Sequence, residues 1–197
     1  VPVMANLGGA QLRDLNHARI IEMVKRLEVQ ALVVHLNPGQ ELFQPDGDRD
    51  FRGIKNSLFR FCELSPTPVV VKETGFGITP SLVEELLDAG VAYVDVAGSG
   101  GTNWITVESY RNNNGSERES AKEFEDWGLP TAYVLAGLGD IRGPVLASGG
   151  IRTGMDIAKA VALGADLAGL ALPFIRAEVD RGIDGVSELI QSLATTV

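Results

Sequence analysis

Four polar side chains that could bind or transform a ligand lie close together in this sequence. They belong to the segment HLNPGQE at residues 35–41, which continues an apolar run. Polar residues in a loop stiffened by proline and glycine, at the end of such a run, are typical of a strand that delivers residues to a site. His35 and Asn37 would point to the same side of an extended strand. A lone histidine is more often structural, but strand packing does not explain this cluster, so we interpret His35, Asn37, Gln40 and Glu41 as functional.

A lysine and a glycine-rich segment end the next two apolar runs. Lys72 closes the run Val69–Val71, and a buried ammonium needs an anionic partner. We therefore expect Lys72 at a ligand site, with a structural salt bridge as the alternative. The segment Gly98–Trp104 would let a backbone approach a flat ligand closely. Thr102 adds a polar contact, and Trp104 either covers an apolar substrate or packs in the core.

A late segment has the features of a phosphate site. Ser148–Gly154 combines three glycines with Arg152 and opens a helical pattern, and Gly169–Leu172 follows downstream. Free N–H groups at a helix N-terminus, the helix dipole and an arginine together favour an anion. The pairing predicts a phosphate ligand without saying which one.

Six short apolar runs, separated by amphipathic helical patterns, must position these residues. One helix is predicted to start at Thr79-Pro80 and to stop at Gly90, and another to run from Gly154 to Gly164. The runs are rich in Val, Leu and Ala, as in parallel strands covered by helices on both faces. They are Pro2–Leu7, Ala31–Leu36, Pro68–Lys72, Val91–Ala97, Pro144–Ser148 and Leu167–Leu172. The glycine-rich turns follow late strands and not the first, which favours a (β/α)8 TIM barrel over a doubly wound Rossmann sheet.

The number of runs predicts an incomplete barrel. A (β/α)8 barrel has eight strands and about 250 residues, whereas this chain has 197 residues and six units. We expect one barrel domain over residues 1–197, incomplete at the N-terminus and representing strands 3 to 8, with its first and last strands unpaired. Ser109–Asp126 is rich in asparagine and charge. We expect it to be a mobile insertion in a βα loop on the active-site face, with a solvated loop without function as the alternative.

Composition limits the partners and the compartment. The formal charge of −9, from 17 basic and 26 acidic residues, argues against nucleic acid and against an anionic membrane. The single Cys62 can form neither an internal disulfide nor a thiolate metal cluster, which favours a reducing, cytoplasmic setting. The apolar stretch Leu167–Ile175 is too short to span a membrane. We expect a cytoplasmic homo-oligomer that binds a small molecule.

Taken together, these motifs resemble the type 2 isopentenyl diphosphate isomerases of the FMN-dependent barrel superfamily. The matching segments are ANLG (5–8), HLNPGQE (35–41), QPDGDRDF (44–51), VKETGFG (71–77), GSGGTNW (98–104) and SGGIRTGMDIAKAVALGAD (148–166). HLNPGQE is the most specific of them, and the match covers nearly the whole chain outside Ser109–Asp126. The resemblance implies an isomerase of isoprenoid biosynthesis that interconverts isopentenyl and dimethylallyl diphosphate. Its cofactors would be reduced FMN and Mg²⁺, with NADPH as the flavin reductant.

The resemblance also implies roles for matching positions. The flavin would be held by Asn6, Lys72, Thr102, Gly150, Ile151, Arg152, Ala171 and Leu172, the last five around its phosphate. The catalytic group would comprise Gln40, His35, Asn37, Trp104 and Glu108, and Glu41 would hold Mg²⁺ on the diphosphate. Because the Gln40 amide does not titrate, we expect it to orient or relay. Ala97 departs from the family pattern, which often has a serine touching FMN there, and the family's basic N-terminal motif and first two strands have no counterpart.

Two other functions stay open. One is an FMN-dependent oxidoreductase on the same barrel, either resembling IMP dehydrogenase, which needs a nucleophilic cysteine in a barrel loop, or a 2-hydroxy-acid oxidase, which needs a His/Arg pair. Cys62 and His17 both fall in helical patterns, which disfavours these enzymes. The other is an inactive, truncated barrel fragment that only binds phosphate or assembles with another chain.

Overall fold

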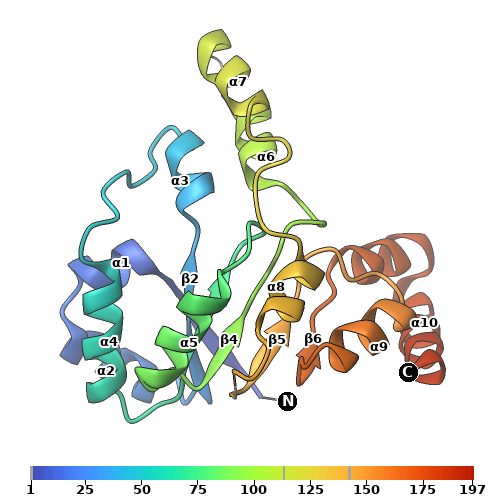
Figure 1. Ribbon diagram of the computed structural model, residues 1–197, viewed down its shortest axis with the longest axis horizontal. Helices are drawn as coiled ribbons and strands as arrows, with labels where there is room; N and C mark the ends of the chain where they lie inside the picture. The colour runs from blue at the N-terminus through green and yellow to red at the C-terminus, as the bar shows by residue number, and fades with distance from the viewer. Residues whose placement is uncertain (1, 113, 142) are drawn as a thin grey trace.

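Parallel strands, each followed by helices, build the chain in the computed structural model, which describes residues 2–112, 114–141 and 143–197 (Figure 1). The described residues form one sheet of six strands in chain order, and every neighbouring pair is parallel. The strands are β1 (Met4–Gly8), β2 (Ala31–Leu36), β3 (Val69–Glu73), β4 (Tyr93–Asp95), β5 (Val145–Ala147) and β6 (Leu167–Ala168). A doubly wound sheet reverses its strand order near the centre. The unbroken order therefore confirms the barrel-type fold.

Helices connect the strands, and two of them begin where the sequence predicts. Thr79 caps the first turn of α5 by accepting a hydrogen bond from the N–H of Leu82, and Thr153 forms a capping box with Asp156 on α9. In the described part of the chain, no helix combines the length and the apolar character needed to cross a membrane. The helices are α1 (Gly9–Asp14), α2 (His17–Arg26), α3 (Pro38–Phe43), α4 (Ile54–Leu64), α5 (Pro80–Asp88), α6 (Trp104–Arg111), α7 (Gly115–Lys122), α8 (Thr131–Gly137), α9 (Gly154–Ala162) and α10 (Leu172–Thr196).

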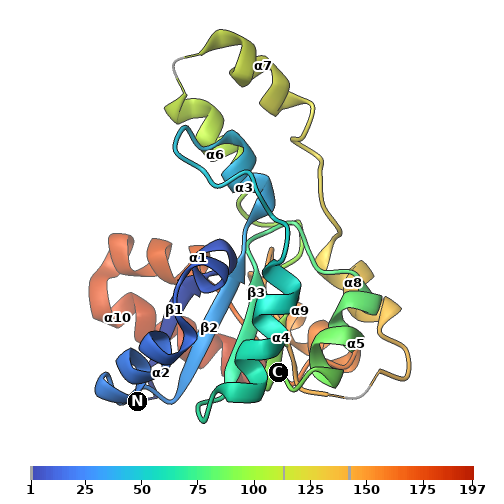
Figure 2. The same cartoon turned by 90° about the vertical axis from the view of Figure 1, so that its left-hand side faces the viewer.

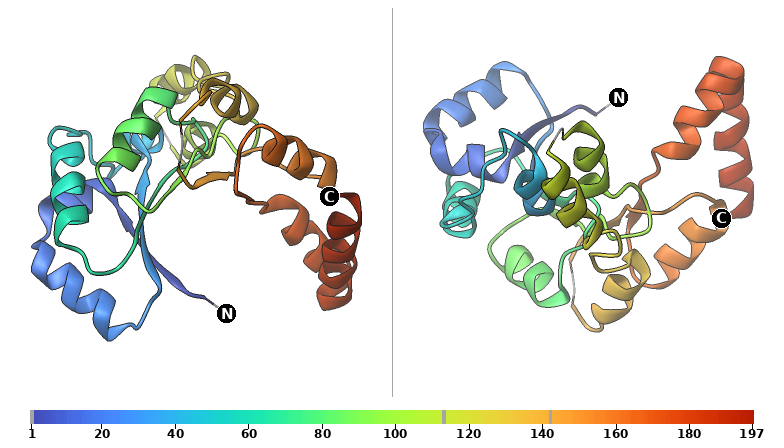
Figure 3. Two further views of the ribbon diagram at one scale, coloured as in Figure 1. Left: turned by 60° about the horizontal axis from the view of Figure 1, so that its bottom comes forward. Right: turned by 90° about the horizontal axis from the view of Figure 1, so that it is seen from above.

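Alternate residues along the strands divide the apolar side chains between two clusters. Val34, Val71 and Val94 pack with helix residues in the larger core. Val33 and Val70 belong to a small cluster on the opposite, inner face of the sheet. Figure 3 shows the helices in an arc outside the sheet, with β1 and α10 at the two ends of the arc. Side chains that continue the alternation of Val33 and Val70 therefore reach the inner side at the carboxyl ends of the strands.

The first and last strands are the edges of this sheet. Among the described residues, β1 pairs with β2 alone and β6 with β5 alone. Apolar side chains are exposed there, with Met4 at 53% and Leu167 at 60% of full exposure. The sheet is thus an open arc and not a closed six-stranded barrel, which confirms the expectation of two unpaired edge strands.

The segment Ser109–Asp126 is largely helical, apart from Asn113, which lies outside the described residues. It contains the end of α6 and the whole of α7, which project beyond the carboxyl ends of the strands (Figure 2). Part of it is packed, because Ala121 shares a cluster with Phe76 and Ile105. A solvated loop therefore does not describe the whole segment, while its mobility stays a prediction.

Candidate active site

Polar residues at the strand ends meet in one cavity at the carboxyl edge of the sheet. Lys72 on β3 is in register with His35 on β2 and with Asp95 on β4, and all three continue the inner-face alternation. The cavity has a volume of about 370 Å³, which suits a small molecule. It is lined by Asn6, His35, Gln40, Lys72, Thr74, Gly75, Ala97, Gly101, Thr102, Trp104, Ser148 and Gly149.

A second cavity, of about 460 Å³, adjoins the first. The two share Lys72, Gly101, Thr102, Ser148 and Gly149. All five residues predicted to surround a phosphate line this second cavity. Its remaining lining residues are Asp95, Gly150, Ile151, Arg152, Gly169, Leu170, Ala171 and Leu172. The structure thus places the two halves of the predicted cofactor site side by side.

Two glycine turns approach each other so closely between these cavities that side chains would not fit. A Cβ on Gly149 would clash with the carbonyl oxygen of Gly98, and one on Gly150 would come within 2.8 Å of the carbonyl carbon of Gly100. Gly149 and Gly150 also have φ values of 92° and 80°, which favour glycine. Arg152 ties the turns together by donating to the carbonyl oxygens of Gly100 at 2.9 Å and Gly150 at 3.3 Å. The absence of side chains therefore lets the two turns pack against each other, and the backbone of Gly101 and Gly149 lines both cavities.

The N-terminus of α9 is capped by its own side chains. The carboxylate of Asp156 accepts from the N–H groups of Arg152 at 3.1 Å and Thr153 at 3.0 Å, and its own N–H donates to Thr153 Oγ1. The prediction of free N–H groups is therefore wrong for these residues, because the capping box satisfies them. The backbone that lines the second cavity belongs instead to the turns 149–151 and 170–172, together with the Arg152 side chain.

His35 lines the first cavity and makes a hydrogen bond through its ring. Its Nδ1 lies 2.6 Å from Oδ1 of Asn6. Burial, and next the charge of Lys72, lower the pKa of His35 below its usual value, so the ring is neutral at neutral pH. Because an amide oxygen only accepts, the proton sits on Nδ1 and the lone pair on Nε2. The sequence predicted His35 and Asn6 as site residues in separate segments, and in the structure their side chains form a hydrogen bond.

Gln40 and Trp104 line the cavity from helices, whereas Glu108 does not line it and instead contacts Gln40. Gln40 Nε2 donates to Glu108 Oε1 at 2.9 Å. Glu108 is fully buried and pairs with Arg111, whose Nη1 lies 3.0 Å from its Oε2. Trp104, the first residue of α6, lines the cavity and keeps 39% of its surface exposed. Glu108 therefore fixes the Gln40 side chain without lining the cavity itself.

Asn37 and Glu41 lie to one side of the main cavity. Strand alternation stops at Leu36, because Asn37 lies at the N-terminal boundary of α3, without a capping side-chain hydrogen bond, and Pro38 begins the helix. Asn37 and Glu41 line a smaller cavity of about 230 Å³, which His35 also reaches. Glu41 accepts a hydrogen bond on each oxygen, from Asn37 Nδ2 at 2.9 Å and from the N–H of Asp48 at 2.8 Å. Within the described ranges, no three His, Cys, Asp or Glu side chains form a group that could hold a metal, so Glu41 stands as a single carboxylate.

Two further polar residues of the cavities were not predicted. Asp95 is buried at the end of β4, and its carboxylate accepts hydrogen bonds from Ser148 and Ala97. Burial raises its pKa above the usual value. Thr74 Oγ1 is buried without a hydrogen-bond partner in the described residues. Strand alternation, which the sequence argument applied to His35 and Asn37, would have marked Asp95 as well if applied to the run Val91–Ala97.

Comparisons with known proteins give both a family and a set of relatives. Residues 55–197 match the sequence profile of the family described as FMN-dependent dehydrogenase. The chain is 50% identical over 190 residues to the isopentenyl-diphosphate delta-isomerase of Borrelia garinii subsp. bavariensis, covering 96% of this chain and 53% of that protein. It is 43% identical over 205 residues to the enzyme of the same name from Nostoc sp., covering 100% and 58%. The chain spans about half the length of these curated relatives.

Solved structures with the same fold are more distant in sequence. A mandelate oxidase mutant with a monooxide FMN adduct matches at a TM-score of 0.62 and 22% identity, over 99% of this chain and 56% of the other. A double mutant of flavocytochrome b2 with sulfite bound matches at 0.64 and 21% identity, over 98% and 48%. At this identity the likeness concerns the fold alone, and together with the family match it agrees with a partial TIM barrel of the FMN-dependent type.

Proposed function

The chain belongs to the FMN-dependent dehydrogenase family, and from this premise we propose that it carries the flavin and substrate sites of an isopentenyl-diphosphate isomerase. The reaction would interconvert isopentenyl and dimethylallyl diphosphate in isoprenoid biosynthesis. The observation that carries the proposal is the convergence of three separate segments on adjoining cavities. HLNPGQE, VKETGFG and the glycine turns lie far apart in sequence, yet each lines the cavities at the strand ends.

The residues present fit FMN. Together the two cavities have the size of a cofactor site, and the glycine turns expose backbone that can lie against a flat ring or a phosphate. The unpartnered hydroxyl of Thr74 lines the first cavity beside Lys72, where a polar ligand would satisfy it. We assign the phosphate to Arg152 with the turns 149–151 and 170–172, and the ring to the side of Lys72 and Thr102.

Protonation of an unactivated alkene is beyond ordinary side chains near neutral pH. Reduced FMN, with NADPH as its reductant, would supply the proton carrier when bound. The side chains of this protein bind and orient the substrate. Neutral His35 would offer its Nε2 lone pair, and Gln40, whose Nε2 donates to Glu108, would offer its amide oxygen. Trp104 covers the apolar part of the substrate.

Mg²⁺ would bind together with the substrate. One carboxylate suits Mg²⁺ when phosphate oxygens and water provide the other ligands. Glu41 is that carboxylate in our proposal, and the Asn37 amide, 2.9 Å away, orients it. The metal would thus neutralise diphosphate charge at the border of the two cavities that His35 reaches.

The geometry gives no support to the oxidoreductase alternatives. Cys62 lies in α4 and is packed against the larger core, and burial raises the pKa of its thiol to about 11. His17 lies in α2, 2.9 Å from Ser57 Oγ and edge-on to Phe61. Neither residue lines the two cavities. No second candidate function follows from the site.

An anaerobic assay with FMN, NADPH and Mg²⁺ tests the proposal. We expect bleaching of the flavin on reduction, followed by conversion of isopentenyl to dimethylallyl diphosphate in proton NMR spectra. Flavin that is reduced by a 2-hydroxy acid without isomerisation would point to an oxidoreductase. Protein that binds inorganic phosphate but no FMN would leave only the phosphate-binding fragment.

A further inference from the structure

Asp95 has an unexpected place, because it puts a carboxylate into a cavity that suits an anionic cofactor. It is the last residue of β4 and faces the inner side of the sheet, in register with Lys72. It lines the second cavity with Arg152 and the turn 149–151. Like charges repel at short range, so a purely binding surface would not place an acid here. The hydrogen bonds of Asp95 suggest what it does.

The carboxylate of Asp95 joins the ends of two neighbouring strands. It accepts from Ala97 N at 3.1 Å, from Ser148 N at 3.1 Å and from Ser148 Oγ at 2.8 and 2.9 Å. The strand register between β4 and β5 ends at the pair Asp95 and Leu146, and a backbone hydrogen bond from Gly98 N to Ser148 O, at 3.1 Å, continues the contact. Beyond this point the side chain of Asp95 helps to hold the two strands together.

Both residues held by Asp95 begin a glycine turn of the cofactor site. Ala97 precedes Gly98–Gly101, and Ser148 precedes Gly149. Ala97 has a φ of 35°, a left-handed conformation that costs a residue with a Cβ of the order of 1 kcal/mol and persists where the surroundings fix it. The hydrogen bond from its N–H to Asp95 is one such constraint. Asp95 is therefore placed to fix the spacing of the two turns.

Asp95 also supplies a charge. Its register partner Lys72 carries the opposite charge and lines both cavities. His35 is the register partner of Lys72 on the other neighbouring strand and is neutral. Among these three register partners, Lys72 is therefore the positive side chain and Asp95 the negative one. A carboxylate in this position opposes further negative charge in the cavity.

We propose that Asp95 is a positioning residue that clamps the two glycine turns around the flavin and lowers the preference of the site for reduced flavin. This inference rests on the proposed flavin site. Two-electron reduction leaves the isoalloxazine ring more negative near and above neutral pH. Asp95 lines the second cavity and is in register with Lys72, which borders both cavities, so its carboxylate next to the ring side disfavours the reduced form relative to the oxidised form.

The variant Asp95→Asn tests the charge, because it keeps the size of the side chain and an acceptor oxygen. We expect the ratio of affinities for reduced and oxidised FMN to rise about tenfold. For a two-electron couple this raises the reduction potential of bound FMN by about 30 mV. The matched control is Glu73→Gln, which removes a carboxylate from the opposite face of the same sheet and should leave the potential unchanged. A potential in Asp95→Asn equal to that of the unmodified protein would overturn the proposal.

The variant Ser148→Ala tests the clamp, which is the set of hydrogen bonds from Ala97 and Ser148 to Asp95. It also tests the positioning role of Asp95 if Asp95→Asn does not fold. It removes one hydroxyl from the clamp and leaves the charge of Asp95 in place. We expect FMN affinity, measured by quenching of flavin fluorescence, to fall about fivefold with no change in potential. Unchanged affinity would overturn the clamp. If the unmodified protein binds no FMN, the proposed function itself fails; if it binds FMN while the variants show no effect, this inference alone fails.

Discussion

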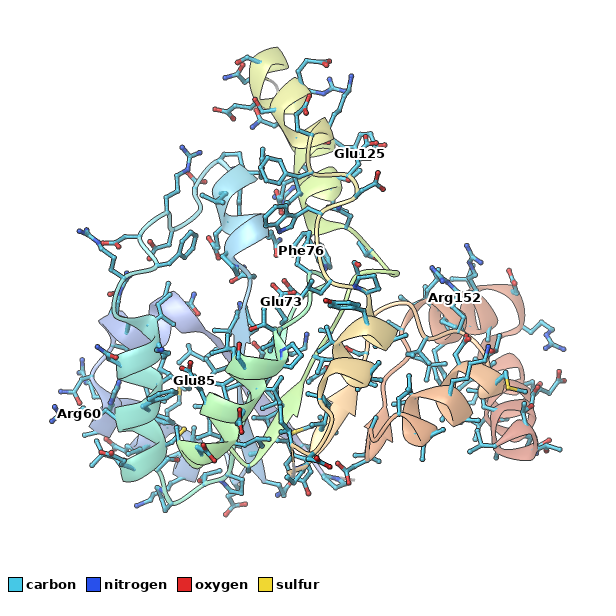
Figure 4. All side chains as sticks on the ribbon, viewed as in Figure 1. Arg60, Glu73, Phe76, Glu85, Glu125 and Arg152 are labelled. Atoms are coloured by element: carbon cyan, nitrogen blue, oxygen red, sulfur yellow. The ribbon has the colours of Figure 1, made fainter. Side chains whose placement is uncertain are left out.

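Lys72 and Glu73 are adjacent charged residues at the end of β3, and they meet opposite environments. Lys72 faces the inner side, lines both cavities and donates from Nζ to the carbonyl oxygen of Glu73 at 2.7 Å. Glu73 faces the helices with 5% of its surface exposed, and its Oε2 accepts from the N–H groups of Thr74 and Phe76 at 2.6 Å each. Figure 4 shows Glu73 at the top of the sheet with Phe76 just above it, toward the projecting helices.

The comparison shows that, at the end of β3, the face of the strand decides which groups each charge meets. On the helix side the chain satisfies the charge itself, with backbone amides that also shape the loop Thr74–Gly77. That loop packs against the helices that carry site residues. The Phe76 ring lies against Gly39 of α3 and belongs to one cluster with Ile105 of α6. On the inner side the charge is left facing a cavity, where a ligand can use it.

The largest expected effect is a pH dependence of the unfolding free energy that comes from Glu73 on the helix side of the sheet. Burial raises the pKa of Glu73 from 4.5 to about 7. A raised folded-state pKa contributes stability that is fully present below about pH 4.5 and is lost as the pH rises through about 7. The non-titrating variant Glu73→Gln lacks this loss. We expect the unfolding free energy of the unmodified protein, relative to the variant, to fall by about 3 kcal/mol between about pH 4 and pH 8.

Urea unfolding at the two pH values measures this difference. The control is Glu119→Gln, which changes an exposed carboxylate that is paired with Lys122. FMN affinity at neutral pH should stay within about twofold in Glu73→Gln, because this carboxylate does not line the flavin cavities. A pH-independent stability difference would mean that Glu73 is not a strained buried acid.

The second effect concerns Lys72, whose replacement should weaken FMN binding without changing the free energy of unfolding. Lys72→Met keeps the apolar stem and removes the ammonium from the cavity. Loss of a charge-assisted hydrogen bond should weaken FMN binding by about 2 kcal/mol, or about 30-fold. Fluorescence titration gives the affinity, and thermal unfolding without FMN should be unchanged within about 0.5 kcal/mol. Lys55→Met, on α4 and paired with Glu85, is the control; equal losses in the two variants would remove the distinction between the faces.

A third and smaller effect concerns the far end of the flavin site. Arg152 lies apart from Glu73, near α9 (Figure 4), and its side chain is exposed. Arg152→Ala should weaken FMN binding by about 1.5 kcal/mol, because a partly hydrated charge gives less than a buried one. Riboflavin, which has no phosphate, should lose less affinity than FMN, because only the hydrogen bonds from Arg152 to the two turns are then removed. If riboflavin binding weakens as much as FMN binding, Arg152 supports the turns and does not hold the phosphate.

Much of the fold could be predicted because parallel strands covered on both faces appear as continuous apolar runs. The bounds of β2 were predicted correctly, and Thr79 marked the start of α5. The runs around β4, β5 and β6 were predicted too long, because their last residues lead into the glycine-containing turns and because β4 and β5 also start later than predicted. Local sequence could not predict that Glu108 is buried against Gln40, since these residues lie 68 positions apart and meet through the packing of α3 on α6.

Two omissions had a signal in the sequence. Asp95 is a charged residue within the apolar run Val91–Ala97, and a buried charge needs a partner, which is the argument that identified Lys72. Thr153 and Asp156 have the spacing of a capping box, so the capped start of α9 was readable. In both cases a single side chain has a different role from its segment: Asp95 lies in a run interpreted as core, and Asp156 caps a helix start interpreted as a phosphate site.

The smallest expected effect concerns Glu41, which shares features of both faces. Like Glu73 it accepts an amide N–H, and like Lys72 it borders a cavity. Glu41→Gln keeps the shape and removes the charge, so it should weaken Mg²⁺ while leaving FMN in place. Because phosphate oxygens and water would provide most ligands to the metal, we expect the Mg²⁺ concentration for half-maximal isomerisation to rise about fivefold, or about 1 kcal/mol. The control Glu85→Gln should not change it. An unaltered Mg²⁺ requirement in Glu41→Gln would make Glu41 a structural carboxylate of the Glu73 kind, and the diphosphate would then have to be placed elsewhere in the cavities.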